Sequence, residues 1–201
     1  MPVELRYADV EPLMAMLADV PESGRPAFQA RLRHLRQLGT PEGVNTGKGT
    51  RAIYGAKQVF QMAYAVELLM LGITPERASS IVRDFWPIII VRAVVGALHT
   101  QPIATAFAGN VSEPSRRSEK GEVVSTGITA ARNIGLADEA IDREQGISRA
   151  TLDFLTSERH HLIISASNIV GAVTEYLRAN HPEAFDAFIA EIKDWRHGII
   201  T

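Results

Sequence analysis

The 201-residue chain contains no cysteine. This absence excludes disulfide bonds, thiolate metal sites and thiol redox sensors, because each needs a cysteine side chain. Four charged residues interrupt the first eleven positions, so we expect no signal peptide. The longest apolar run, residues 86–98, is broken by Arg92 and is too short to cross a bilayer. We therefore expect a soluble, cytoplasmic protein.

Recognisable catalytic and metal-binding patterns are also missing. His160 and His161 are adjacent, so a strand would place them on opposite faces, and no acidic residue stands at a suitable ligand spacing. Ser165 and Ser167 lie near them but in no nucleophile-elbow sequence. The other histidines considered are isolated in the sequence: His99, His181 and His197. We expect no enzyme, cofactor or resident metal, since an active site would have to be assembled by the fold alone.

Positive charge is concentrated in one segment, although the formal net charge of the chain is −2. Residues 24–60 contain seven basic residues against the single acid Glu42. The basic residues of this segment are Arg25, Arg31, Arg33, Arg36, Lys48, Arg51 and Lys57. Residues 87–201 instead have eleven basic and fourteen acidic residues. Such local concentration of positive charge is typical of a surface that contacts phosphates.

The basic segment begins with a predicted amphipathic helix from Pro26 to Leu38, which Gly39 and Pro41 end. Its apolar face repeats at helical spacing through Phe28, Leu32, Leu35 and Leu38. The opposite side carries Gln29, Arg33 and Arg36 at the same spacing, with Arg31 beside them. Arginine and glutamine are side chains that read base edges in the major groove. The alternative interpretation is the solvated side of an ordinary surface helix.

A glycine-rich hairpin is predicted after Gly43, in the sequence VNTGKGTRAIYG. We expect Lys48 at the tip of this wing, and Arg51 and Tyr54 on its returning strand. A phosphate-binding loop of the GxxxxGK[ST] type does not fit, because Gly49 follows Lys48 and the glycine spacing is one residue short.

A helix pair follows, divided by Gly72. The first helix is predicted from about Ala56 to Leu71, and Thr74-Pro75-Glu76 then gives an N-cap, a proline at the first helical position and an early acid. Upstream of the basic segment we expect one further helix, from about Val10 to Asp19. The apolar residues of these helices are interpreted as core.

The order of these pieces resembles the DNA-binding domain of MerR-type transcription regulators, over residues 26–82. That family has a Leu-Arg-aromatic-aromatic run before a glycine, a wing ending in Arg-x-Tyr and a Leu-Gly-hydrophobic turn. The matching positions are Leu32, Arg33, Leu35, Leu38 and Gly39 in the helix, Gly49, Arg51 and Tyr54 in the wing, and Leu71, Gly72 and Ile73 in the turn. His34 and Leu35 replace the aromatic pair, and one more residue separates Arg51 from Tyr54 than in the family.

The resemblance implies that Arg33 and Arg36 face the major groove and that Lys48, Arg51 and Tyr54 contact phosphates. The full set of expected DNA-binding residues is Gln29, Arg31, Arg33, Arg36, Lys48, Arg51 and Tyr54. The absence of cysteine argues against the metal-responsive branch of that family. No heptad array follows residue 86, so the dimerising coiled coil of the family is missing.

Residues 87–201 are predicted to form a small α+β domain. The run IIIVRAVVGALH fits a helix or a buried strand, and residues 110–122 read as a loop. Short strands are expected in residues 122–129 and 160–167, followed by a helix through residue 180 that Ser167 caps. The last helix, residues 182–195, presents Phe188, Ile192 and Trp195 to the domain or to a partner chain.

The sequence thus predicts a mainly α protein, with a MerR-like winged helix-turn-helix over residues 1–86 and an α+β dimerisation or effector domain over residues 87–201. The leading hypothesis is a transcription regulator in the nucleoid that binds a two-half-site DNA operator as a homodimer. A small-molecule effector and RNA polymerase are further candidate partners. One alternative is an architectural or phage-type DNA-binding accessory factor. The other is a small-molecule-sensing or degenerate enzyme domain on a winged-helix scaffold.

Overall fold

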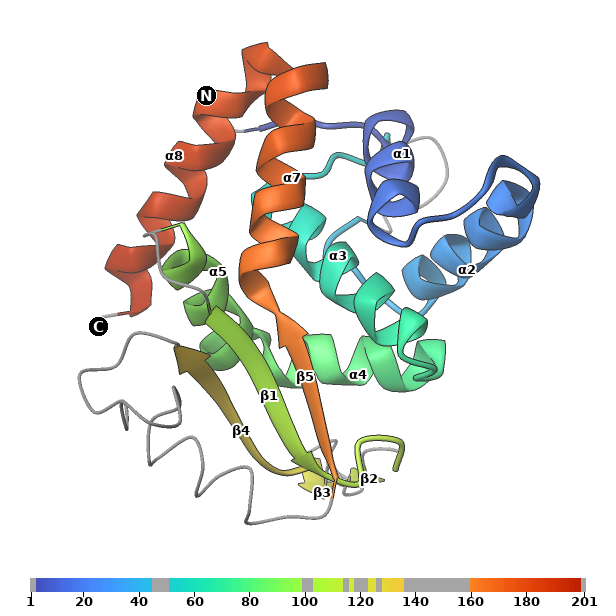
Figure 1. Ribbon diagram of the computed structural model, residues 1–201, viewed down its shortest axis with the longest axis vertical. Coiled ribbons are helices and arrows are strands. Elements are labelled where there is room, and N and C mark those ends of the chain that lie inside the picture. The colour runs from blue at the N-terminus through green and yellow to red at the C-terminus, as the bar shows by residue number, and fades with distance from the viewer. Residues whose placement is uncertain are drawn as a thin grey trace, which may run out of the picture.

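A computed structural model of the chain describes residues 3–44, 51–98, 103–113, 116–117, 123–125, 128–135 and 160–199. The N-terminal part contains α1 (Tyr7–Leu17), the short 3-10 turn η1 (Glu22–Gly24), α2 (Arg25–Gln37), α3 (Ala56–Met70) and α4 (Pro75–Phe85). The remainder contains the π-helical turn η2 (Trp86–Ile90), α5 (Val91–Ala97), β1 (Ile103–Gly109), β2 (Arg116–Arg117), β3 (Val123–Ser125), β4 (Ile128–Gly135), β5 (His161–Ser165), α7 (Ala166–Asn180) and α8 (Pro182–Ile199). The described fold is therefore mainly helical with a small antiparallel sheet, as expected (Figure 1). In the described residues no helix is long and apolar enough to span a bilayer.

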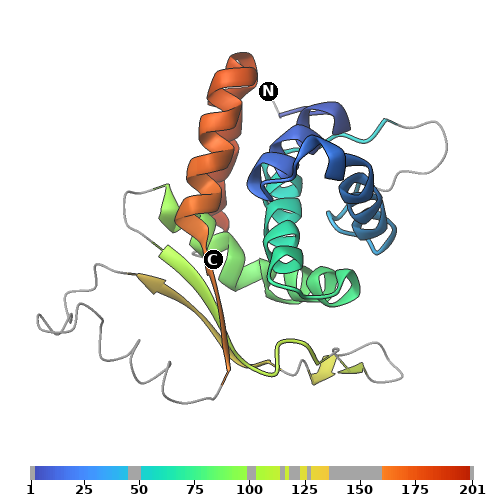
Figure 2. The same cartoon turned by 45° about the vertical axis from the view of Figure 1, so that its right-hand side comes forward.

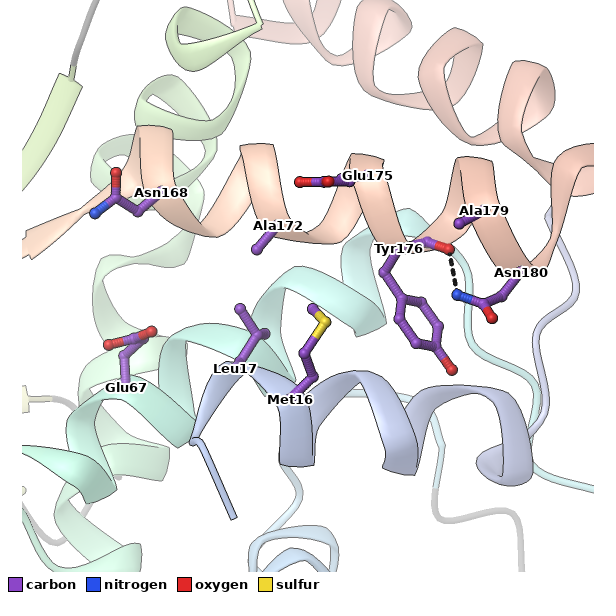
Figure 3. A pocket seen from close by; sticks show the side chains of 9 residues that line it. All are labelled: Met16, Leu17, Glu67, Asn168, Ala172, Glu175, Tyr176, Ala179 and Asn180. Carbon is purple, nitrogen blue, oxygen red and sulfur yellow. Dashed lines mark hydrogen bonds between the residues drawn. The ribbon is translucent and has the colours of Figure 1, made fainter. Parts of the chain in front are cut away.

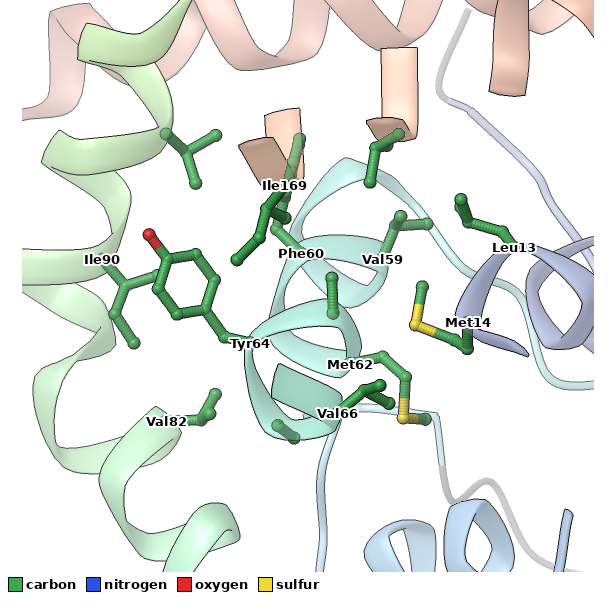
Figure 4. Packing of buried hydrophobic residues seen from close by; sticks show 14 of the residues in the cluster. Leu13, Met14, Val59, Phe60, Met62, Tyr64, Val66, Val82, Ile90 and Ile169 are labelled. Carbon is green, nitrogen blue, oxygen red and sulfur yellow. The ribbon is translucent and has the colours of Figure 1, made fainter. Parts of the chain in front are cut away.

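Helix α3 lies at the centre of the molecule, and α1, α4, α7 and α8 pack around it (Figures 1 and 4). Its residues from Val59 to Val66 are all buried, on every side of the helix. A helix that is apolar all round is stable only inside a core. The predicted helix of residues 56–71 is confirmed, and its surroundings explain why its apolar stripe is so broad.

Local sequence signals set several helix ends. Gly39 and Gly72 adopt φ values of +86° and +82° just after α2 and α3, in the left-handed region that favours glycine at a helix C-terminus. Thr74 caps α4 by accepting the backbone N–H of Arg77 at 3.4 Å. The predicted boundaries of these helices are confirmed. Helix α1 begins three residues earlier than predicted, because the Asp9 carboxylate accepts the backbone N–H of Arg6 at 2.7 Å.

The sheet has the order β4-β1-β5, and both pairings are antiparallel. Helices cover one of its faces, while β2 and β3 pair separately beyond its end (Figure 2). On the helical side Phe107 of β1 packs edge-on against Phe85, with ring centroids 5.3 Å apart. The neighbouring Thr105 hydroxyl hydrogen-bonds the Tyr64 hydroxyl of α3 at 3.2 Å. These two contacts join the central strand to the helical layer.

Several C-terminal expectations are refined by the structure. The segment that fitted either a helix or a buried strand is helical, forming η2 and α5. Strand β5 is confirmed, but the segment predicted as one strand contains β3 and the start of β4, with residues 126–127 outside the described ones. The loop predicted over residues 110–122 is described only at 110–113 and 116–117, and the latter pair forms β2.

The N-cap of α7 was assigned wrongly. Ser165 occupies it, with its hydroxyl accepting the Asn168 backbone N–H at 3.2 Å. Ser167 instead accepts the backbone N–H of Ile103 at 2.8 Å, so its hydroxyl ties α7 to the start of β1.

Helix α8 contributes to the subunit's own core. Phe188 and Ile192 are 0% exposed, and Phe188 lies 5.6 Å from the Phe60 ring of α3. Trp195 packs edge-on against Phe60 and Trp86. Of the two alternatives for Phe188 and Ile192, contact with the domain or with a partner chain, the structure supports contact with the domain. The core cluster continues from Val3 to Ile192, so the two predicted domains share it, and the division at residue 86 stays a prediction.

We expect Phe188→Ala to lower the free energy of unfolding by about 3–5 kcal/mol, because it leaves a cavity beside Phe60. Phe185 is on the same helix but only half-buried, so Phe185→Ala is the matched control and should cost less. Urea denaturation of both variants measures the difference. Equal costs at the two positions would contradict the assignment of Phe188 to the core.

Candidate nucleic-acid interface

Helix α2 presents a cationic surface that contains no acidic residue from Arg25 to Gln37. Its apolar face is buried through Phe28, Leu32 and Leu35, as predicted. On the remaining surface Arg31 and Arg33 are exposed, while Gln29 and Arg36 are half-buried. Gln29, Arg33 and Arg36 share one face by their spacing, whereas Arg31 is two residues from Arg33 and points elsewhere.

Two of the seven basic residues of this region are neutralised. Arg25 donates to Glu11 at 2.8 Å, and Lys57 donates to Glu42 at 2.7 Å. The Lys57 ammonium also holds the pKa of the Glu42 carboxyl below its usual value. By contrast, Arg31, Arg33, Arg36 and Arg51 form no ion pair with a described residue. Positive charge without an ionic partner is therefore confined to fewer residues than the sequence suggested. Three of these four arginines lie on α2.

Arg36 is held against the protein rather than extended into solvent. Its guanidinium carbon lies 5.3 Å from the centre of the Tyr7 ring of α1, a cation–π distance. Its Nε is buried without a hydrogen-bond partner among the described residues. Arg36 is thus better placed to fix the orientation of α2 than to extend towards a ligand. Arg33 is the most exposed cation of the face expected to read bases.

Helix α4 fixes the C-terminal end of α2. The Thr40 hydroxyl, just after α2, hydrogen-bonds the Ser79 hydroxyl at 2.7 Å, and Ser79 also donates to the Leu38 carbonyl at 3.3 Å. On the surface the His34 ring lies 2.9 Å from the Glu76 carboxylate. The sequence identifies Glu76 only as an acid in the first turn of a helix. Neither its contact with His34 of α2 nor the contact of Arg36 with the Tyr7 ring is predicted from the sequence.

The connection between α1 and α2 is longer than in most helix-turn-helix motifs. Seven residues, Ala18 to Gly24, separate the two helices and include η1. A turn of about three or four residues is usual in helix-turn-helix proteins. Helices α1 and α2 therefore follow each other in the expected order, but the turn between them is longer than usual.

The tip of the predicted wing lies outside the described residues, because Gly47, Lys48 and Gly49 fall in 45–50. The residues that lead into the wing are anchored to α3, where the Gln61 side chain accepts the Glu42 backbone N–H at 2.9 Å. Its returning end pairs with the N-terminal segment, since Leu5 and Tyr54 exchange backbone hydrogen bonds of 3.1 and 2.9 Å. Arg51 is exposed three residues before this bridge. This pairing places the Arg51 segment beside the start of α1.

Tyr54 differs from the expectation drawn from the family resemblance. Its side chain is 0% exposed, and its hydroxyl has no hydrogen-bond partner among the described residues. Burial also raises the pKa of Tyr54. A DNA phosphate does not reach this hydroxyl in the arrangement described, so Tyr54 supports the base of the segment that carries Arg51.

His160 and His161 line one groove, and His181 is not among the residues that line it. His160 is exposed and His161 half-buried beside this shallow groove of about 340 Å³ that Ile73 and Val111 also line. His181 lies 3.8 Å from Glu183, whereas His99 falls outside the described residues. No group of three His, Asp or Glu side chains in the described ranges is placed to hold a metal ion.

No protein-family model, curated protein or solved structure compared with the chain matches it.

We expect the His34–Glu76 contact to stabilise the protein in a pH-dependent way. Glu76 raises the pKa of His34 above its usual value, and His34 lowers that of Glu76. A raised histidine pKa gives stability that is present below about pH 6.5 and lost as the pH rises through the folded-state value. His34→Gln should therefore lower the melting temperature at acidic pH and leave it unchanged at alkaline pH. Glu76→Gln should show the same loss at acidic pH and a further loss that persists at alkaline pH, because it also removes the acid from the first turn of α4. The double variant should show no pH-dependent loss beyond that of His34→Gln.

For Tyr54→Phe we expect a melting temperature equal to or above that of the parent. The change removes a buried hydroxyl without a partner and keeps the ring, which fills the core. Affinity for DNA should also be unchanged. A selective loss of DNA affinity in a stable variant would show that the hydroxyl does contact a phosphate.

Proposed function

We propose that the protein is a sequence-specific DNA-binding transcription regulator that inserts α2 into the major groove. The observation that carries this proposal is the acid-free surface of α2, on which Arg31, Arg33 and Arg36 have no described ionic partner. Of the other basic residues nearby, Arg25 is paired with Glu11 and Lys57 with Glu42, so most of the unpaired described cations of this region lie on α2. Unpaired arginines on a firmly held helix are suited to phosphates and base edges.

The firm packing of α2 against the rest of the protein supports sequence-specific contacts to bases rather than nonspecific electrostatic binding to DNA. The helix is buried along Phe28, Leu32 and Leu35 and fixed at its C-terminal end by Ser79 and Glu76. A recognition helix must hold its side chains in register with the base pairs, and rigid support provides this. On the α2 face that carries Gln29, Arg33 and Arg36, we assign Gln29 and Arg33 to contacts with bases. Arg36 is assigned to orienting the helix through its contact with the Tyr7 ring.

Arg51 is assigned to the DNA backbone. It is exposed and without a described ionic partner, on the extended segment that pairs through Tyr54 to Leu5. Lys48, at the expected wing tip, is assigned to the same role from the sequence. Contacts of this kind position a protein on the duplex and contribute affinity without reading sequence.

One α2 helix and one wing bury little DNA surface, so we infer that two copies of the chain bind two half-sites. The interface between them does not include Phe188 or Ile192, because both are enclosed in the subunit core. Sedimentation of the full chain alone and with DNA measures the stoichiometry. Two chains per duplex fit this proposal, and one chain at saturation contradicts it.

The proposal is tested on a DNA site selected from a random pool by the full-length protein. Arg33→Ala should lose about 1–3 kcal/mol of binding free energy for the selected site, and little for random DNA. The control is Arg92→Ala, which removes an exposed arginine from α5, on the other side of α3 from α2 (Figure 1). If the Arg33 and Arg92 variants bind alike while folded, α2 is not the reading helix.

We expect Arg51→Ala to weaken selected and random DNA equally. Each lost phosphate contact should lower the slope of log affinity against log salt by about one unit. Titrations at several salt concentrations measure this slope. A loss restricted to the selected site would instead assign Arg51 to bases.

A further inference from the structure

A groove of about 570 Å³ lies between α1, α3 and α7 (Figure 3). Its volume falls within the range of about 300–1,000 Å³ that is usual for small-molecule sites. The groove is separate from the exposed face of α2, and its lining comes from both halves of the chain.

Polar residues line the two ends of the groove, and apolar residues line its middle. Glu67 of α3 and Asn168 of α7 lie at one end, and Leu17, Met16 and Ala172 form an apolar middle (Figure 3). Tyr176 and Asn180 of α7 close the other end (Figure 3). The Tyr176 hydroxyl donates to the Asp9 carbonyl at 3.4 Å, which ties this end to α1.

Glu67 is a carboxylate without a described counter-ion. It is half-buried, and burial, with no neighbouring charge contributing, raises its pKa. A second carboxylate, Glu175 of α7, also lines the groove. Arg25, a basic group that acts on Tyr176 at the other end, is already paired with Glu11 at 2.8 Å. The groove therefore has an excess of negative charge, and a cation would offset the desolvation of Glu67.

We propose that this groove binds a small organic cation, with its ammonium group at Glu67 and its apolar body over Met16, Leu17 and Ala172. An anion would be repelled by Glu67 and Glu175, and a neutral apolar ligand would bury Glu67 further without compensating its charge. The exposed thioether of Met16, 47% accessible, provides an adaptable apolar wall. The proposal does not depend on DNA binding, because ligand binding is measured without DNA.

The test is calorimetric titration of the full chain with three probes of equal length, hexylammonium, 1-hexanol and hexanoate, at matched ionic strength. Hexylammonium has seven non-hydrogen atoms, and at about 0.6 kcal/mol per atom, within the range of about 0.3–1.5 kcal/mol for small ligands, its dissociation constant is about 1 mM. Phenethylammonium, with an aromatic body, serves as a second cation. We expect both cations to bind, hexanol to bind more weakly and hexanoate not to saturate.

Three variants locate the binding. Glu67→Gln should weaken both cations about tenfold and leave hexanol unchanged, since one charge pair of about 1.4 kcal/mol is lost. This variant should fold, because it removes a desolvated charge. Ala172→Leu should block all probes by filling the middle of the groove. Glu4→Gln, at an exposed residue ahead of α1, is the matched control and should change nothing.

Three results would each overturn the proposal. The first is that neither cation saturates up to about 20 mM, well above the expected dissociation constant. In the second, hexanol or hexanoate binds as tightly as hexylammonium. The third is cation binding that survives both Glu67→Gln and Ala172→Leu in folded protein. None of these results bears on whether α2 binds DNA.

Discussion

The burial of α3 on all sides is the constraint on which the rest of the structure depends. No single partner covers a helical segment that is buried on every side, so α1, α4, α7 and α8 each supply part of the cover. Two polar side chains of α3 join it to other parts of the chain. Tyr64 bonds Thr105 of the central strand, and the Gln61 carbonyl holds the backbone of Glu42. One helix therefore connects the sheet, the C-terminal helices and the base of the predicted wing.

This arrangement separates two kinds of charged residue. Arg25 and Lys57 are used within the fold, where Glu11 and Glu42 neutralise them. Arg31 and Arg33 have no such partner and stand on a helix whose apolar side is fixed against the body of the protein. Exposed ion pairs contribute little stability, so leaving these arginines unpaired costs the fold little. We propose that their charge serves to bind a ligand, and phosphate is the chemistry that fits it best.

The helices were predictable because their signals are local. Residues 26–38 and 56–71 have the 3.6-residue apolar repeat, and Gly39 and Gly72 mark their C-terminal ends. Strand β1 was missed, since its sequence IATAFAG is rich in alanine, which has a weak strand preference. Its pairing with β4 and β5 on both sides, a long-range property, determines its structure.

The candidate site was predictable in composition but only partly in geometry. The basic face of α2 follows from residue spacing, whereas the burial of Tyr54 depends on its pairing with Leu5, far away in the chain. Likewise, the apolar stripe of α8 showed that Phe188 would be covered but did not show by what. The groove at Glu67 has no sequence signal, because α1, α3 and α7 form it only after folding.

We propose that α2 is the surface that contacts DNA. The most direct measurement is amide and side-chain footprinting of the full chain with and without a selected DNA duplex, by hydrogen exchange and arginine-specific labelling. We expect protection of Arg33, of the exposed residues of α2 and of the Arg51 segment, with α7 and α8 unchanged. Protection of α7 or α8 with α2 left accessible would contradict it.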